Sequence, residues 1–441
     1  MTHAHGANMI SSVVIASLTC AVMIASVLYF PRVKAGRISL DTYWMVALVG
    51  AAVTLATKQI SLGRLWDAMT ASSSIGPIKI LLLFLSMTVL SVFLDEVGFF
   101  RYLANKTLKL AGNDQTRIFA ILFWTVSVLT VFTSNDVIVL TFTPFLCYFA
   151  KNAHVDPKPY LIAEFVAANT MSMTFVIGNP TNVYIATTYG VSFLDYFLVM
   201  ALPTLAAAAV AFGVLYLVFH RSLRVPVLAT PEEVKIEDKP MLAVGLSLLL
   251  VATGFLVVGP YVGVPMWLVA VSAVGVLIVA VSILSLVRKR APVELLKTFR
   301  RAPWQLVPFV LSMFVLILAL TEQGVTDKIG HLIGTRLALW KYGVLSMLSA
   351  NVINNIPMSV FFCPIVGTLP AGERAGAMYA TVIGSNLGAF LTPIGALAGI
   401  MWLSMLKRHE VKLRFGEFIK YGAIVGFPAL AAALGVLQLV L

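Results

Sequence analysis

The chain has 441 residues, of which 60% are hydrophobic and only 11% are charged. Soluble domains carry about 25% charged residues, so this composition excludes a water-soluble globular protein and predicts one embedded in lipid. The formal net charge of +12 suggests nucleic acid at first sight. However, the basic residues stand in short loops between apolar segments, where membrane topology accounts for them, and we expect no nucleic-acid partner.

Twelve apolar segments recur along the chain. A segment of about 17–25 apolar residues is long enough to cross a hydrocarbon core of roughly 30 Å. The first segment lacks a basic start and a small-residue cleavage site, which predicts a retained span rather than a signal peptide. The segments begin near residues 9, 42, 75, 117, 159, 192, 241, 265, 305, 340, 376 and 418.

Two of these segments, 117–150 and 340–369, are long blocks that polar residues interrupt at 133–136 and at 351–357. Each block either crosses the membrane or returns as a re-entrant hairpin. With two hairpins, the loops carry 24 Lys and Arg residues on one side and 6 on the other, whereas two crossings give 15 and 15. Cytoplasmic loops carry the excess. The sequence therefore predicts two hairpins, ten spans and both termini outside the cytoplasm.

The order span, hairpin, broken span occurs twice. Each half has five spans, an odd number, so the second half inserts upside down relative to the first. Such inverted repeats are typical of secondary transporters, with a substrate site near the midplane where the breaks meet. We predict an all-α polytopic membrane protein of two inverted repeats: residues 1–230 with hairpin 117–150 and broken span 159–189, and residues 240–441 with hairpin 340–369 and broken span 376–406.

Polar residues at the breaks are the candidate site. Backbone at a helix break has unsatisfied groups, and lipid offers no partners. Asn, Ser and Thr side chains there either satisfy that backbone or line a shared cavity, and four clusters at four corresponding breaks favour the cavity. The predicted substrate- and ion-binding residues are Ser134, Asn135, Asp136, Asn169, Asn179, Thr181, Asn182, Asn354, Asn355, Ser385, Asn386 and Thr392.

Asp136 is the predicted proton-coupling residue. It lies half-way along an apolar block with no basic residue nearby in sequence. An ionisable group at such a depth costs at least ~2.5–3.5 kcal/mol and usually marks an ion or proton pathway. Glu164 is a weaker candidate, because it lies six residues into its span and could reach the interface. Asp95, Glu96 and Glu322 lie at span ends, where charged groups are ordinary.

Enzymatic motifs are absent from the sequence. It contains no Gly-Lys dipeptide, which excludes a Walker A loop, and neither H-E-x-x-H nor G-x-S-x-G. We therefore expect no enzyme, no cofactor and no metal site, and uphill work driven by an ion gradient or a separate subunit. Cys20, Cys147 and Cys363 lie inside apolar segments without a C-x-x-C pair, so we interpret them as small buried hydrophobic residues.

The motifs at the breaks resemble those of the ArsB arsenite permeases of the ion transporter superfamily, and the likeness covers nearly the whole chain. The resemblance implies export of arsenite and antimonite across the inner membrane in exchange for protons, sometimes with a soluble ATPase subunit. It also implies a scaffold and a mobile region. The matching motifs are Ser134-Asn135-Asp136 followed by Leu140-Thr141-Phe142-Thr143-Pro144, then Asn179-Pro180-Thr181-Asn182, Asn354-Asn355-Ile356-Pro357 and Thr392-Pro393-Ile394-Gly395-Ala396-Leu397-Ala398.

Two positions depart from the family pattern. Ser385-Asn386 stands where these permeases usually have Cys-Asp, and Val137 stands where they have Gly, which leaves Asp136 as the only deep carboxylate at the breaks. Arsenite near neutral pH is mostly an uncharged trihydroxide, which amides and hydroxyls can bind, whereas an acid disfavours organic anions. The nearest rival is a Na⁺/H⁺ antiporter, because Asp136 with Asn and Thr oxygens also suits a hard cation. A channel is less favoured, since channels assemble pores around a symmetry axis.

Overall fold

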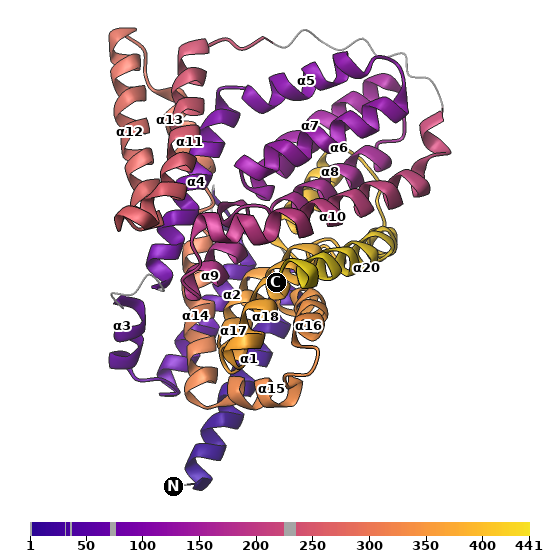
Figure 1. Cartoon of the computed structure of the whole chain (residues 1–441). Coiled ribbons are helices and arrows are strands. Elements are labelled where there is room, and N and C mark those ends of the chain that lie inside the picture. Colours follow the sequence, from indigo (N-terminus) through magenta and orange to yellow (C-terminus); the bar gives the residue numbers. More distant parts are fainter. Residues whose placement is uncertain (1, 31, 36–37, 71–75, 225–234) are drawn as a thin grey trace.

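The computed structural model describes residues 2–30, 32–35, 38–70, 76–224 and 235–441 (Figure 1). These residues form helices and one antiparallel pair of strands, β1 (Arg32–Ala35) and β2 (Ile38–Asp41), in which Arg32 lies opposite Asp41. Eight helices of the described residues are long and apolar enough to cross a membrane. The predicted all-α polytopic fold is confirmed.

Each half of the chain contributes ten of the described α-helices. The first ten are α1 (Thr2–Tyr29), α2 (Thr42–Ala56), α3 (Leu62–Thr70), α4 (Pro77–Glu96), α5 (Phe99–Ala111), α6 (Gln115–Phe132), α7 (Asn135–Ala153), α8 (Lys158–Met171), α9 (Pro180–Thr188) and α10 (Phe193–Phe219). The second ten are α11 (Lys239–Val258), α12 (Met266–Val287), α13 (Val293–Arg301), α14 (Leu306–Glu322), α15 (Val325–Ile333), α16 (Ala338–Ile353), α17 (Asn355–Gly367), α18 (Ala371–Gly388), α19 (Leu397–Arg408) and α20 (Phe415–Val440). Short 3-10 turns are η1 (Val176–Gly178), η2 (Ser222–Arg224) and η3 (Gly259–Val262).

Corresponding helices share local features when α1 is matched with α11 and so on to α10 with α20. Both α5 and α15 follow a glycine in the left-handed region, Gly98 with φ 85° and Gly324 with φ 70°. Glycine adopts this region without the steric penalty that a Cβ imposes. Both helices also end at a glycine with φ 68°, Gly112 and Gly334. The chain therefore makes the same turn after α4 as after α14.

Packing between the halves is reciprocal. Helix α4 packs against α12 and α14 against α2, while α9 packs against α17 and α19 against α7. Helices α10 and α20 run side by side (Figure 1). Exchanging the two halves reproduces each of these pairs, which is the arrangement expected of two related repeats. The upside-down relation of the repeats and their boundaries stay predictions.

The chain leaves the helical conformation at each of the four expected interruptions. The interruptions separate α6 from α7, α8 from α9, α16 from α17 and α18 from α19. Helices α7, α9, α17 and α19 thus begin at a break, so each presents the free N–H groups and the positive dipole end of an N-terminus there. Asn179 and Asn354 cap α9 and α17, whereas α7 and α19 have no side-chain cap, so donors at those two starts are available to oxygen-rich ligands.

Three long-range ion pairs bear on whether the two blocks return or cross. They are Lys158 with Glu417 at 3.0 Å, Arg64 with Glu322 at 2.7 Å and Arg301 with Asp95 at 2.7 Å. A topology with two hairpins places both members of every pair on the same side. Two crossing blocks would separate the members by a bilayer about 30 Å thick. The ion pairs favour hairpins, even though α6 is by itself long and apolar enough to cross a membrane.

Candidate functional site

One side-chain amide joins the break between α8 and α9 to the end of α18. The Oδ1 atom of Asn386 accepts hydrogen bonds from Ser172 Oγ at 2.9 Å and from Asn179 Nδ2 at 3.0 Å. Its Nδ2 donates to Asn182 Oδ1 at 2.7 Å and to the carbonyl of Val382 at 2.9 Å. Asn386 is fully buried. The two halves of the chain are therefore tied together by a dry network of amides.

Backbone groups of the break fix the orientation of this network. Asn182 Nδ2 donates to the carbonyl oxygens of Ser172 at 2.7 Å and Phe175 at 3.1 Å, so its Oδ1 must face Asn386. Asn179 is the N-cap of α9, where its Oδ1 accepts from the backbone N–H and the hydroxyl of Thr181, both at 3.1 Å. Such a cap satisfies a donor that the helix start leaves free. Asn179 and Asn182 therefore stabilise the helix break and are also predicted site residues.

The tip of the first hairpin meets α8 through a second amide pair. Asn135 Nδ2 donates to Asn169 Oδ1 at 3.0 Å, and Asn169 Nδ2 donates to the carbonyl of Phe165 at 2.8 Å. Three buried polar atoms beside this pair have no hydrogen-bond partner: Ser134 Oγ, Asn135 Oδ1 and Thr170 Oγ1. Buried polar atoms are normally paired, so these three atoms keep hydrogen-bonding capacity for a polar solute or water.

In the second half, the hairpin tip pairs with the broken span through backbone as well as side chains. The backbone N–H of Asn355 donates to the carbonyl of Gly395 at 2.9 Å, and Asn354 Nδ2 donates to the carbonyl of Ile394 at 3.0 Å. Asn354 has φ 71° and ψ 151°, a conformation that is rare for residues other than glycine and recurs at functional sites.

Asn351 holds the broken span against α16. Its Nδ2 donates to the carbonyl oxygens of Met347 at 2.8 Å and Gly388 at 3.0 Å. Its Oδ1 accepts from the backbone N–H of Thr392 at 2.8 Å and from the Thr392 hydroxyl at 2.7 Å. Ser385, beside Asn386 on α18, lies 3.4 Å from Ser359 of α17, hydroxyl to hydroxyl.

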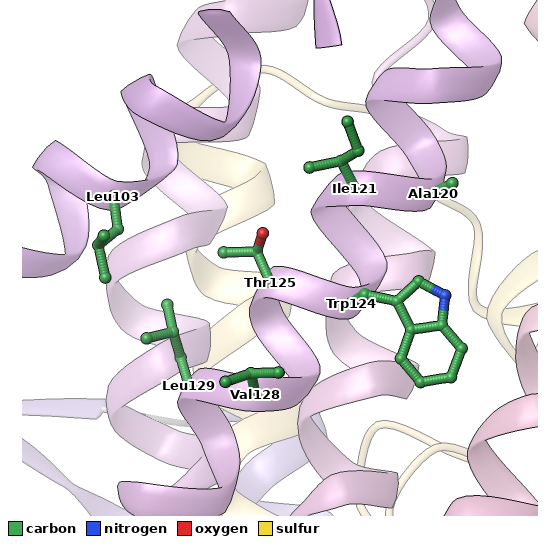
Figure 2. Close-up of a pocket in the computed structure, with 7 residues that line it drawn as sticks. All are labelled: Leu103, Ala120, Ile121, Trp124, Thr125, Val128 and Leu129. Carbon is green, nitrogen blue, oxygen red and sulfur yellow. The ribbon is translucent and has the colours of Figure 1, made fainter. Parts of the chain in front are cut away.

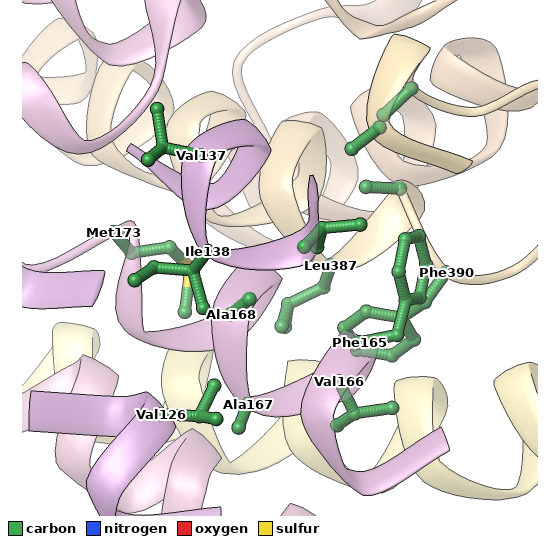
Figure 3. Close-up of a cluster of buried hydrophobic side chains, with 14 of the residues drawn as sticks. Val126, Val137, Ile138, Phe165, Val166, Ala167, Ala168, Met173, Leu387 and Phe390 are labelled. Carbon is green, nitrogen blue, oxygen red and sulfur yellow. The ribbon is translucent and has the colours of Figure 1, made fainter. Parts of the chain in front are cut away.

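Apolar side chains surround these amides and keep them dry. Figure 3 shows Val137 and Ile138 of α7 close to Ala168 of α8, with Met173 of the break and Leu387 of α18 completing the group. All five side chains are 5% exposed or less. Hydrogen bonds are electrostatically stronger in such surroundings, and unpaired groups are more costly.

Asp136, in the first turn of α7, lies in a different space from the amides. Its carboxyl lines a cavity of about 490 Å³ together with Tyr43, Pro393 and Leu403. Among the described residues it has neither a hydrogen-bond nor an ion-pair partner. The N-terminus of α7 favours a carboxylate, and the unpaired carboxyl is free to bind what enters the cavity.

The rim of this cavity is charged. Arg32, Asp41 and Lys407 line it, and Arg32 Nε lies 2.9 Å from Asp41 Oδ1. The charge distribution predicts that the loops bearing Arg32 and Lys407 face the cytoplasm. Under that topology the side of the cavity lined by Arg32 and Lys407 faces the cytoplasm, and Asp136, from the hairpin tip, lines the same cavity.

Glu164 does not reach the interface, which corrects the interpretation from its place in the sequence. It is fully buried, and the Thr143 hydroxyl of α7 lies 3.0 Å from both of its carboxyl oxygens. Trp402 Nε1 of α19 donates to Oε2 at 3.3 Å. The cause is the tilt and packing of α8, which is enclosed along its length, so six residues of sequence depth do not bring this side chain to the surface.

Sequence reasoning missed several residues of the network. Ser172, Trp402 and Ser359 make the contacts described above, while Thr143 belonged to a matching motif without a predicted role and Asn351 belonged to an interruption. Single Ser, Thr and Trp residues are common in membrane spans, so nothing in their type or spacing distinguishes them. Asn351 had a usable signal, because an amide deep in an apolar block needs partners.

A larger pocket lies away from the breaks. It has a volume of about 530 Å³ on α5 and α6, and Figure 2 shows its lining, including Leu103, Trp124, Val128 and Leu129. Thr125 supplies the polar side chain, and its hydroxyl lies 3.2 Å from that of Thr107. An apolar hollow of this kind on a helix face suits lipid chains and offers little to a polar solute.

Comparisons with known proteins point to transport. The model of a family described as citrate transporters (CitMHS) matches residues 42–378. An arsenical pump membrane protein of Escherichia coli (strain K12) is 28% identical over 423 residues, which cover 89% of this chain and 92% of that protein. One from Yersinia enterocolitica is 28% identical over 377 residues, covering 81% and 85%. The resemblance to arsenite permeases is confirmed.

A solved structure agrees with the fold. The YdaH transporter of Alcanivorax borkumensis, described as having an unusual topology, superposes with a TM-score of 0.55 over 98% of both chains at 13% identity. At that identity the likeness concerns the fold alone. The family match extends over most of the chain, and the relatives compared are transporters by their descriptions, in agreement with the expectation of a transporter rather than an enzyme. This chain therefore belongs to the CitMHS family of multi-pass membrane transporters.

Proposed function

We propose that this protein is a secondary transporter of the inner membrane that exports arsenite and antimonite from the cytoplasm in exchange for protons. The observation that carries the proposal is Asp136, an unpaired carboxyl that lines a cavity of about 490 Å³. The charge distribution of the loops supports a cavity that opens on the cytoplasmic side. The arsenical pump proteins among its relatives support the substrate.

The polar groups at the breaks suit a small neutral trihydroxide. Such a solute both donates and accepts hydrogen bonds, as do amides and hydroxyls. Ser134 Oγ, Asn135 Oδ1 and Thr170 Oγ1 are buried and unfilled, whereas Asn386 already uses its hydrogen-bonding positions. We propose that the substrate enters through the Asp136 cavity and binds at the first hairpin tip, between this cavity and the amides, and that the other predicted site residues hold the surrounding helix breaks.

Proton exchange supplies adequate energy for export. One proton entering for each neutral solute leaving moves one net charge, worth about 2.3 kcal/mol per 100 mV. At ~150 mV this amounts to roughly 3.5 kcal/mol, or a concentration ratio of a few hundred at 1.4 kcal/mol per decade. A soluble ATPase subunit is then an addition to the transporter and not a requirement.

Sodium–proton antiport is the second candidate. The unfilled oxygens of Ser134 and Asn135 stand next to Asp136 in the chain, and a carboxylate with neutral oxygens is a ligand set that hard cations accept. Citrate, which the family description names, is less suited to this site. Arg32 is engaged by Asp41, and the carboxylate of Asp136 would repel an organic anion.

The test uses everted membrane vesicles and, in parallel, proteoliposomes that contain only this chain. Under an imposed proton gradient and without ATP, we expect concentrative arsenite uptake that collapses when a protonophore is added. Vesicles lacking the chain are the control. Proton flux driven by sodium without arsenite would support the antiporter, and citrate uptake without arsenite uptake would contradict the proposed substrate.

A further inference from the structure

Glu164 is a carboxyl that the proposed transport site does not use. It lies in α8, is fully buried, and contacts Thr143 of α7 and Trp402 of α19. Trp402 is itself 0% exposed, and its ring packs on Phe165 and Phe418 at centroid distances of 4.9 Å and 5.7 Å. Glu164 therefore connects the hairpin and the broken span of the first half to the broken span of the second.

No cation neutralises this carboxyl among the described residues. On its own helix, Lys158 is paired with Glu417 at 3.0 Å. The basic side chains of the adjoining helices are directed elsewhere, since Arg117 of α6 approaches Asp114 and Lys407 of α19 lines the Asp136 cavity.

The titratable groups nearest to Glu164 carry no positive charge either. Cys147 of α7 lies one helical turn beyond Thr143, and Tyr421 of α20 lies against Trp402. An unpaired carboxylate in such a place costs several kcal/mol, so a buried acid without a cation is held in its neutral form.

The contacts with Thr143 agree with a neutral acid. The Thr143 Oγ1 atom lies 3.0 Å from Oε1 and 3.0 Å from Oε2. A hydroxyl has one proton and donates it to one oxygen. The second contact is satisfied when the acid donates its own proton to Thr143, while the indole N–H of Trp402 occupies a remaining lone pair of Oε2.

Helix α19 lies between Glu164 and the transport cavity. Its residues Ile400, Met401, Leu403, Leu406 and Lys407 line the Asp136 cavity, whereas Trp402, in the same stretch, points to Glu164. The hydrogen bond from Trp402 thus anchors the helix that forms a wall of the cavity. A charge on Glu164 would have to be hydrated, and water can reach it when α19 moves away from α8.

We propose that Glu164 is a second proton site of this transporter, protonated in the present arrangement, and that its proton keeps α19 docked as the cavity wall. When Glu164 loses this proton to cytoplasmic water, α19 separates from α8. Glu164 is a positioning residue in this proposal, because it acts through Trp402. The proposal extends the proposed function, but the docking of α19 can be measured without any substrate.

The first measurement follows cavity access. In a variant whose three cysteines are replaced by alanine, Leu403→Cys reports the wall of the cavity and Lys412→Cys in the following loop serves as reference for intrinsic thiol reactivity. We expect the ratio of labelling rates, Cys at 403 over Cys at 412, to rise several-fold from acid to alkaline pH. Glu164→Gln should hold the ratio at its low value, whereas the exposed control Glu373→Gln should behave as the parent. An unchanged pH response in Glu164→Gln overturns the proposal.

A structural role alone would give a different pattern. Glutamine keeps the shape and the hydrogen bonds of a neutral acid, so a purely structural Glu164 predicts no difference between parent and Glu164→Gln in the pH response. Trp402→Phe retains the ring but removes the donor and should raise the labelling ratio at all pH values; a parent-like ratio would contradict the anchor.

The second measurement observes the proton itself. Infrared difference spectra of the purified protein between acid and alkaline pH should contain the carbonyl stretch of a protonated acid that disappears in Glu164→Gln and persists in Asp136→Asn. If Glu164→Gln retains the full band, Glu164 is not a proton site. Neither readout requires arsenite, so failure of arsenite transport in vesicles would refute the proposed function and leave this inference standing.

Discussion

Asn386 uses all four hydrogen-bonding positions of its carboxamide, with two bonds accepted and two donated. The resemblance to the arsenite permeases leads to the expectation of an acid at this position, so the amide is informative. In this chain an acid would place a carboxylate oxygen against the oxygens of Asn182 and Val382, which now lie 2.7 Å and 2.9 Å from the Nδ2 donor. The hydrogen-bonding network around residue 386 therefore requires an amide rather than a carboxylate.

We expect Asn386→Asp to lower the stability of the protein. Each buried acceptor left without a donor costs about 1–3 kcal/mol, and protonation of the new acid would restore one donor. Thermal unfolding of the purified protein should show a lower melting temperature, with the deficit shrinking as the pH falls. An identical melting temperature at neutral pH would mean that the network rearranges freely.

Asp136 should be the residue that couples proton movement to transport. Asp136→Asn keeps the shape and some hydrogen-bonding capacity but cannot titrate, so the variant should equilibrate arsenite without accumulating it. Uptake into everted vesicles with and without a proton gradient measures this difference. Asp136→Ala should lose more, because the cavity end then has no polar group. Parent-like accumulation by Asp136→Asn would exclude Asp136 as the coupling group.

Residue chemistry alone predicted part of the candidate site. Amides and an acid deep in apolar blocks are costly unless they have partners or a function, which is why the sequence nominated Asn179, Asn182 and Asn386. It could not separate the amides from Asp136, because the distances between breaks depend on how the helices pack. The prediction that Glu164 could reach the interface was wrong for the same reason, since its burial comes from neighbouring helices and not from its own segment.

At the scale of elements, Asn351 fixes the break between α18 and α19. Asn351→Ala would leave the Thr392 donors and the Gly388 carbonyl without their partner. We expect a loss of about 1–3 kcal/mol for each buried group left unpaired, seen as a lower melting temperature, together with slower arsenite transport. Asn152→Ala, at an exposed position near the end of α7, is the control. Equal melting temperatures for the two variants would mean that the break holds without this side chain.

The sequence predicted most of the order of the elements, but it did not predict the short helices between them. Long apolar runs and polar interruptions follow from the thickness of the bilayer and the needs of broken backbone. The sequence did not predict the helices α3 and α13, because nine-residue amphipathic segments are too short and too polar to be recognised as spans. Their matched positions in the two halves became visible only once the packing was known.

At the scale of the whole molecule, the ion pairs between loops and the distribution of basic residues support the same topology. Arg301 reaches both Asp95 and Glu96 at the end of α4, and these two carboxylates are only 9% and 10% exposed. Partners so enclosed must share one side of the membrane. The two-hairpin arrangement satisfies this requirement, and it also directs the Asp136 cavity to the face with the positive charge.

Site-directed labelling tests this topology directly. Single cysteines at Lys106, His154, Lys297 and Lys412 should react with a membrane-impermeant thiol reagent only from the cytoplasmic side, and those at Ser61 and Thr335 only from outside. The decisive comparison is Lys106 with His154, because these exposed positions flank the first hairpin. Labelling from opposite faces would mean that α6 and α7 cross the membrane as one span. The ion pairs of Arg64 with Glu322 and of Arg301 with Asp95 would then have to join opposite sides of the bilayer, which a hydrocarbon core of roughly 30 Å forbids. Labelling from one face would support the two-hairpin topology, in which the loops that bear Arg32 and Lys407 of the Asp136 cavity share the cytoplasmic side.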